Sequence, residues 1–153
     1  MLVNSSAARY LMGAESAQRR EYGIALLRII LGVVFFAHGY LKFFGMGIDG
    51  VTGFFGGLGI PAPALAAWGV TLLEMVGGLA LILGIFTPVL GLLFVADMAG
   101  AIFFAKRGGG FFAPKGFELE LTLLVASLAV ALTGPGALAL RNVIGGRRAA
   151  GGS

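Results

Sequence analysis

The stretch YGIALLRIILGVVFFAHGYLKFF, residues Tyr22–Phe44, decides the fold of this chain. It is long and apolar enough to cross a bilayer as a helix, which takes about 20 residues. It nevertheless contains three basic side chains, Arg28, His38 and Lys42. A charge at the bilayer centre costs about 2.5–3.5 kcal/mol or more, so such side chains face a partner or a cavity. At about 100° per residue the three can share one helix face. We therefore expect the rest of the chain to supply polar groups that meet this face.

The composition of the 153-residue chain indicates an integral membrane protein. Hydrophobic residues make up 58% of it and the mean hydropathy is +0.97, which is more apolar surface than a soluble domain of this size can bury. The chain has no cysteine and one histidine. This excludes disulfides, thiolate metal sites, iron–sulfur clusters and a haem held by two histidines of one chain. The net charge of +4 lies largely in tails and loops, where it indicates topology and contact with anionic membrane lipids rather than with nucleic acid.

Three further apolar segments predict three further spans. We expect them at Pro63–Phe86, Val89–Phe104 and Phe117–Thr133. In the loop after the first span, Asp49 can cap a short helix through Leu58 that lies in the membrane interface. The predicted fold class is therefore an all-α integral membrane protein, an antiparallel four-transmembrane-helix bundle with a short interfacial helix in the first loop.

Two glycine-rich loops contain partial matches to nucleotide-binding motifs. The G-x-G-x-x-G match at residues 45–50 follows a predicted membrane helix, whereas the dinucleotide fingerprint requires a preceding strand. The loop Lys106–Gly116 has a glycine run but lacks the lysine and hydroxyl placement of a phosphate-binding loop. A flexible loop with Phe111 and Phe112 at the membrane interface is the better interpretation of this second segment.

The spans divide the chain into a polar N-terminal tail (1–21), a transmembrane domain (22–136) and a basic C-terminal tail (137–153). Four spans place both termini on the same side of the membrane. That side carries six arginines, and the other side carries four basic residues: Lys42, Lys106, Arg107 and Lys115. Because basic residues favour the cytoplasmic side, we expect a multi-pass protein of a bacterial or archaeal cell membrane with both termini in the cytoplasm.

Ionisable side chains inside the predicted spans form the candidate site. Glu74 and Asp97 fall near the midplane, and Glu118 falls toward the outer end of the fourth span. Glu120 is turned about 200° from Glu118, so the two cannot both face the interior, and we select Glu118. The candidate ligand-binding residues are Arg28, His38, Lys42, Glu74, Asp97 and Glu118, of which His38, Glu74 and Asp97 are the candidate catalytic residues.

Two interpretations of these charges stay open. In the first, the groups pair with one another and fix helix register, as Arg28 would with Glu74 or Asp97, while Lys42 extends its ammonium to the interface. In the second, they line a polar pocket for an amphipathic or redox-active ligand. A histidine can donate to a quinone carbonyl and exchange protons near neutral pH, and a nearby carboxylate can relay the proton.

Four pieces of the sequence resemble the DoxX family of small four-span membrane proteins. They are Leu26–Gly45, Leu58–Thr87, Ala96–Met98 and Gly110–Leu124. The most specific features are R…H-G-x-x-K in the first span, E-x-x-G-G in the second and Gly-Phe-Glu at Glu118. The chain departs from the family pattern at Asp97, where an asparagine is expected, and in the Glu-Leu-Glu-Leu that begins at Glu118.

This resemblance implies a role in membrane redox chemistry. Relatives include the small membrane subunit associated with thiosulfate:quinone oxidoreductase, and others resemble partners in membrane oxidoreductase complexes that handle thiols and oxidative stress. The leading hypothesis is a quinone-interacting membrane subunit of an oxidoreductase complex, either non-catalytic or quinone-reducing. His38 would contact the head group, and Glu74 or Asp97 would carry protons or balance Arg28.

The partners expected under this hypothesis are membrane lipids, a soluble oxidoreductase subunit and a second copy of the chain. The sequence contains no metal, haem or flavin motif, so a partner would supply the electrons to a bound quinone. Two alternatives come from other functional classes. One is a small proton-coupled transporter or lipid-binding membrane protein that uses the same pocket. The other is a structural membrane anchor that docks a soluble enzyme through Lys106–Gly116 and the basic tail.

Overall fold

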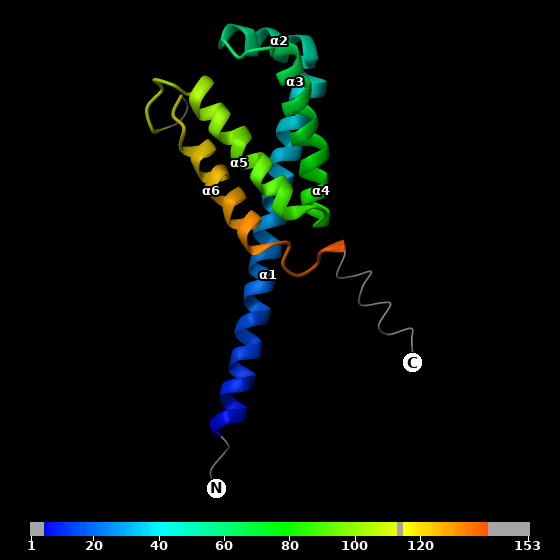
Figure 1. The fold of residues 1–153 in the computed structure, drawn as a ribbon, viewed down its shortest axis with the longest axis vertical. Helices are drawn as coiled ribbons and strands as arrows, with labels where there is room; N and C mark the ends of the chain where they lie inside the picture. The colour runs from blue at the N-terminus through cyan, green and yellow to red at the C-terminus, as the bar shows by residue number, and fades with distance from the viewer. Residues whose placement is uncertain (1–4, 113–114, 141–153) are drawn as a thin grey trace.

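The computed structural model of the protein describes residues 5–112 and 115–140, with side chains from Met12 onward (Figure 1). These residues form helices and no strand, which confirms the all-α prediction. Arg141, Arg147 and Arg148 of the predicted basic tail lie outside the described residues. In chain order the elements are α1 (Ser5–Tyr40), the π-helix η1 (Leu41–Met46), α2 (Gly47–Gly57), α3 (Pro63–Leu72), the π-helix η2 (Leu73–Gly77), α4 (Gly78–Leu83), α5 (Thr87–Phe104) and α6 (Glu118–Thr133).

Three helical segments of the described chain have the length and apolar character of membrane spans. They are Met12–Gly57, Pro63–Leu83 and Thr87–Phe104. They contain the first and third predicted spans, whereas the second ends at Leu83 instead of Phe86. The fourth predicted span corresponds to α6, which has 16 residues. At the α-helical rise this is about 24 Å, shorter than the roughly 30 Å hydrocarbon core of a bilayer. The crossing of the membrane by α6 therefore stays a prediction.

The first helix begins 17 residues earlier than the apolar stretch, at Ser5 instead of Tyr22. The segment predicted as a polar tail is helical, and its side chains from Met12 to Arg20 are exposed. It extends away from the other helices at the lower end of Figure 1. Hydropathy could not reveal this extension, because its alanine, glutamate, glutamine and arginine residues are strong helix formers without being apolar. A helix already nucleated in the span also elongates without a new nucleation cost.

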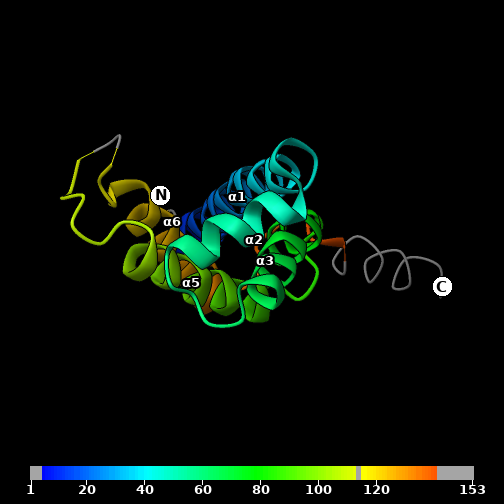
Figure 2. The same ribbon diagram turned by 90° about the horizontal axis from the view of Figure 1, so that it is seen from above.

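The helices associate as two pairs. α1 packs along η2 and α4, and α5 packs along α6. The pairs meet near the α4–α5 connection and diverge toward the other end, where α2 lies across the molecule (Figure 1 and Figure 2). The core between the pairs includes Phe35 of α1 and Phe94 of α5, whose rings stack at 3.7 Å between centroids. The divergence leaves room for a cavity at the α2 end.

Two glycines let α1 approach the second helix closely. A Cβ atom on Gly39 would lie 2.5 Å from the backbone nitrogen of Met75, and one on Gly78 would lie 2.6 Å from that of Phe36. Any side chain at either position would force the two helices apart. Small residues at such crossings are the usual means of close helix packing in membranes, and here they bring the π-helices η1 and η2 within reach of each other.

α2 lies where the short helix of the first loop was predicted. It spans Gly47–Gly57 instead of Asp49–Leu58, and Asp49 lies in its first turn without making the predicted capping hydrogen bond. Val51 and Phe55 are buried against Ala67 of α3, so burial of an apolar face holds α2 in place. Its position in the membrane interface stays a prediction.

Candidate functional site

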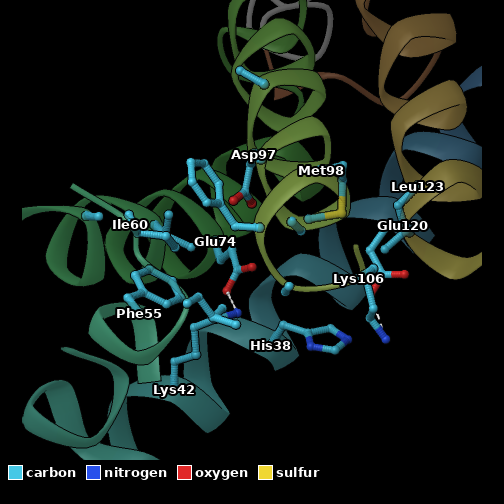
Figure 3. A pocket seen from close by; sticks show the side chains of 18 of the residues that line it. His38, Lys42, Phe55, Ile60, Glu74, Asp97, Met98, Lys106, Glu120 and Leu123 are labelled. Atoms are coloured by element: carbon cyan, nitrogen blue, oxygen red, sulfur yellow. Dashed lines mark hydrogen bonds and ion pairs between the residues drawn. The ribbon is translucent and has the colours of Figure 1, made fainter. Parts of the chain in front are cut away.

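A cavity of about 380 Å³ lies at the end where the helix pairs diverge, between α1, α2, α3, α5 and α6 (Figure 3). Most of its wall is apolar and comes from side chains such as Phe35, Phe55, Val70, Met98 and Leu123. Six ionisable side chains also line it: His38, Lys42, Glu74, Asp97, Lys106 and Glu120. A largely apolar cavity of this size with a few polar groups is typical of small-molecule binding sites.

The ion pair between Lys42 and Glu74 lies in the wall of the cavity. The Nζ atom of Lys42 donates to Oε2 of Glu74 at 2.5 Å. The side chain of Glu74 is 4% exposed and that of Lys42 is 21% exposed. Burial at this level requires a partner, since an unpaired charge in an apolar interior is strongly destabilising. The pair therefore fixes the contact between the first and second helices.

Both members of this pair lie in π-helical segments, Lys42 in η1 and Glu74 in η2. π-helical turns are rare and occur frequently at functional sites. Their presence on both sides of one ion pair distinguishes this crossing from the rest of the described helices. Periodicity at about 100° per residue assumes continuous α-helix, so the sequence carried no signal for either segment.

His38 and Asp97 complete this part of the lining. His38 lies in the last turn of α1, one turn before Lys42, and it is exposed. Asp97 comes from α5, and its Oδ2 atom is buried without a hydrogen-bond partner. Figure 3 shows the Asp97 carboxylate on the same side as Glu74, whereas the His38 ring extends away from the Lys42–Glu74 pair. The site thus combines two carboxylates, an imidazole and an ammonium against an apolar wall, groups that can donate hydrogen bonds and transfer protons.

A second ion pair lines the same cavity, and sequence reasoning missed it. Lys106, just after α5, lies 3.3 Å from Oε1 of Glu120 in the first turn of α6. Glu118 was selected for the interior, but it is not among the lining residues. The periodicity could not reveal which of Glu118 and Glu120 lines the cavity, because α6 is apolar on the helix face of each glutamate.

Arg28 lies away from the cavity and makes no pair with Glu74 or Asp97. It is fully buried, and its Nη1 donates to the carbonyl oxygens of Leu81 and Ile82, both at 2.7 Å. Its Nη2 donates to the carbonyl oxygens of residues 137 and 138 at 3.5 and 3.4 Å. α4 ends at Leu83, where helix carbonyls begin to run out of helical donors. The Leu81 carbonyl also accepts from the N–H of Gly84 at 3.0 Å, and a cation is favourable at that end of the helix dipole. The partners of this buried cation are therefore backbone groups instead of acids.

The structure thus brings together four of the six predicted site residues. Four of them, His38, Lys42, Glu74 and Asp97, line one cavity, and Arg28 and Glu118 do not. Their ability to bind a ligand stays a prediction. Within residues 5–112 and 115–140, no group of three or more His, Cys, Asp or Glu side chains could hold a metal ion.

The fold and the cavity define a small all-helical membrane protein whose largely apolar cavity also has ionisable side chains in its lining. The chain belongs to the DoxX family, whose model matches residues 23–107, so the predicted family is confirmed. A Bacillus subtilis protein named "Putative oxidoreductase CatD" is 38% identical over 120 residues, which cover 78% of this chain and 85% of that protein. The Escherichia coli "Inner membrane protein YphA" is 30% identical over 123 residues, covering 76% and 86%. No solved structure matches the chain.

Proposed function

We propose that this protein is a quinone-interacting membrane subunit of an oxidoreductase complex and that the cavity binds the quinone head group. The observation that supports the proposal is the joining of an apolar cavity of about 380 Å³ to a cluster of His38, Lys42, Glu74 and Asp97 in its wall. A quinone head group presents an apolar ring with carbonyl acceptors. The ring fits the apolar wall, and the carbonyls fit donors such as the imidazole and the ammonium, which has three N–H groups.

The chemistry of the lining residues fits proton exchange with such a ligand. Conversion of a quinone to its quinol takes up two electrons and two protons. The imidazole of His38 has an N–H group that can be donated to a bound ligand, and Glu74 and Asp97 are carboxylates in the lining of the same cavity that can relay protons. Lys42 holds Glu74 in place through their ion pair. The electrons come from a soluble oxidoreductase partner, and the name of the Bacillus relative agrees with a redox role for the family.

His38→Ala is expected to remove the bound quinone from the purified protein. The wild-type chain, gently solubilised from membranes, should retain close to one quinone per chain. The variant should retain about a tenth or less, because loss of one hydrogen bond to a buried acceptor lowers affinity roughly tenfold. Quinone is measured by extraction and chromatography against protein concentration.

A matched control for this measurement is Asp49→Asn. Asp49 is exposed on α2 and does not line the cavity, so its replacement should leave the quinone content unchanged. Equal quinone in the wild type and in folded His38→Ala would contradict the proposal. Quinone absent from both would favour the transporter or the membrane anchor, which proton flux into proteoliposomes and partner capture would then separate.

We further propose that α6 is a fourth span, that α2 lies in the interface and that both termini are cytoplasmic. α6 packs along α5 and directs large apolar side chains outward, including Val125, Leu128 and Leu132, as a lipid-facing helix does. A reporter fused after Ser153 should be active if it functions in the cytoplasm and inactive if it functions only outside the membrane. The reverse pattern would overturn the assigned orientation.

A further inference from the structure

A second cavity, of about 460 Å³, lies beside the first at the end of α5. Three of its lining residues, Phe54, Ala105 and Lys106, also line the first cavity, so the two adjoin. The rest of its lining is cationic or glycine: Arg107, Gly108, Gly109 and Lys115. The lining thus contains three cations and no carboxylate, whereas the ionisable lining of the first cavity is mixed in charge.

Two of these cations lack an acidic partner. Lys106 is paired with Glu120, but the salt bridges of the described residues include neither Arg107 nor Lys115. The guanidinium of Arg107 lies 5.1 Å from the centroid of the Phe103 ring, over its face. Such stacking orients the guanidinium without neutralising it. The cavity therefore keeps an uncompensated positive charge.

Backbone contacts hold the cationic residues close together. The N–H group of Gly109 donates to the carbonyl of Lys106 at 3.0 Å, and that of Phe117 donates to the carbonyl of Gly110 at 3.2 Å. Gly109 also lies against Lys115, because a Cβ atom on Gly109 would fall 2.1 Å from the Lys115 carbonyl oxygen. The two ends of the loop thus meet at a position that only glycine fits, and the charges do not have to be gathered when a ligand arrives.

The surroundings of the cavity indicate a location at the membrane surface. Phe54, Phe111 and Phe112 have exposed rings, and exposed apolar rings beside basic residues are typical of segments at the headgroup level. Under the topology proposed above, this loop lies outside the cytoplasm, where basic residues are disfavoured. The positive-inside rule therefore does not explain why this loop contains three cations, Lys106, Arg107 and Lys115.

We propose that the second cavity binds the phosphate group of an anionic phospholipid. Arg107 supplies a planar fork of donors for phosphate oxygens and Lys115 supplies a compact ammonium. Phe54 and Ala105 give the cavity an apolar wall, which suits the glycerol and acyl part of a lipid and has no role for a free phosphate ion. The proposal rests on the loop lying at the membrane surface, and it is independent of the quinone site.

The test compares lipid binding by the full chain and three variants. Delipidated protein in neutral detergent is titrated with phosphatidylglycerol or with diacylglycerol, which lacks the phosphate, and the complexes are quantified by native mass spectrometry. The first variant, Arg107→Gln with Lys115→Gln, removes both unpaired cations. The matched control, Arg19→Gln with Arg20→Gln, removes two exposed cations from the α1 extension. The third variant, Gly109→Ala, keeps every charge but separates Lys115 from the turn.

We expect the wild type to prefer phosphatidylglycerol over diacylglycerol. The first variant should bind phosphatidylglycerol roughly 30-fold more weakly, because each lost cation near an anionic lipid costs about 1 kcal/mol. The control should stay within about twofold, and Gly109→Ala should weaken binding several-fold if a preformed site is responsible. An equal loss in the control, or no preference for the phosphate-bearing lipid, would overturn the proposal. Displacement of the lipid by millimolar inorganic phosphate would reassign the site to a soluble phosphate and overturn the lipid assignment. Quinone content measured on the same samples reports separately on the first cavity.

Discussion

Replacing Lys42 with methionine is expected to lower the free energy of unfolding by about 3–5 kcal/mol, the usual cost of breaking a buried ion pair from one side. The cost falls on Glu74, whose side chain is 4% exposed and loses the ammonium that donates to it. Lys42 is more accessible, at 21%. We therefore expect the opposite single change, Glu74→Leu, to be less damaging, because the stranded ammonium can reach toward water. Reversible unfolding in mixed detergent micelles measures both.

The double variant, Lys42→Met with Glu74→Leu, removes both charges at once. It therefore tests whether the attraction within the ion pair exceeds the cost of burying its two charges. It should recover most of the lost stability, since apolar replacements of a buried pair are often neutral or stabilising. Arg19→Met is the surface control. Its partner is Glu15, the two side chains are 82% and 70% exposed, and the change should stay within about 0.5 kcal/mol. A double variant as unstable as Lys42→Met would show that the two residues are not coupled.

Arg28→Ala is expected to destabilise the protein by about 3–5 kcal/mol, since a hydrogen bond from a charged group contributes roughly 1.5–3 kcal/mol and the guanidinium makes two at 2.7 Å. The guanidinium holds the end of α4 through the carbonyls of Leu81 and Ile82, and it holds residues 137 and 138 of the C-terminal segment. The loss of stability should therefore appear first at the end of α4 and in the C-terminal segment. Hydrogen exchange should accelerate at the amide of Ala137, which donates to the Glu21 carbonyl.

Arg28→Lys provides the comparison for this change. An ammonium keeps the charge but lacks the planar fork that reaches several carbonyls at once, so it should recover only part of the stability. Because Arg28 does not line the cavity, folded Arg28→Ala protein should keep its quinone, unlike His38→Ala. Unchanged exchange at Ala137 in Arg28→Ala would contradict the structural role assigned to this residue.

Helix positions were predictable from the sequence where apolar length alone decides them. α5 was expected at Val89–Phe104 and lies at Thr87–Phe104. The two added residues include Pro88, which the first turn of a helix accepts because its missing N–H has no partner there. The reversal of the chain falls on Gly84–Phe86, where Gly84 and Phe86 have positive φ values of 74° and 50°.

The candidate site was less predictable, because its geometry depends on contacts between distant segments. Arg28 is bonded to carbonyls more than 50 residues away, and no local pattern marks a carbonyl as the partner of a cation. Glu120 lines the cavity, and which face of α6 turns inward depends on how α6 packs on α5, which the spacing of the two glutamates does not encode. The identification of Glu74 and Asp97 required only that buried carboxylates in an apolar span face inward.

The two π-helical segments have a consequence for how this chain is aligned with its relatives. A turn with i→i+5 hydrogen bonding holds one residue more than the α-helical turn it replaces. A relative with continuous α-helix at η1 or η2 would thus be one residue shorter within the helix itself. Alignments that allow gaps only in loops would then shift the columns of Lys42 or Glu74. Comparisons of these positions across the family therefore need gaps inside the helices.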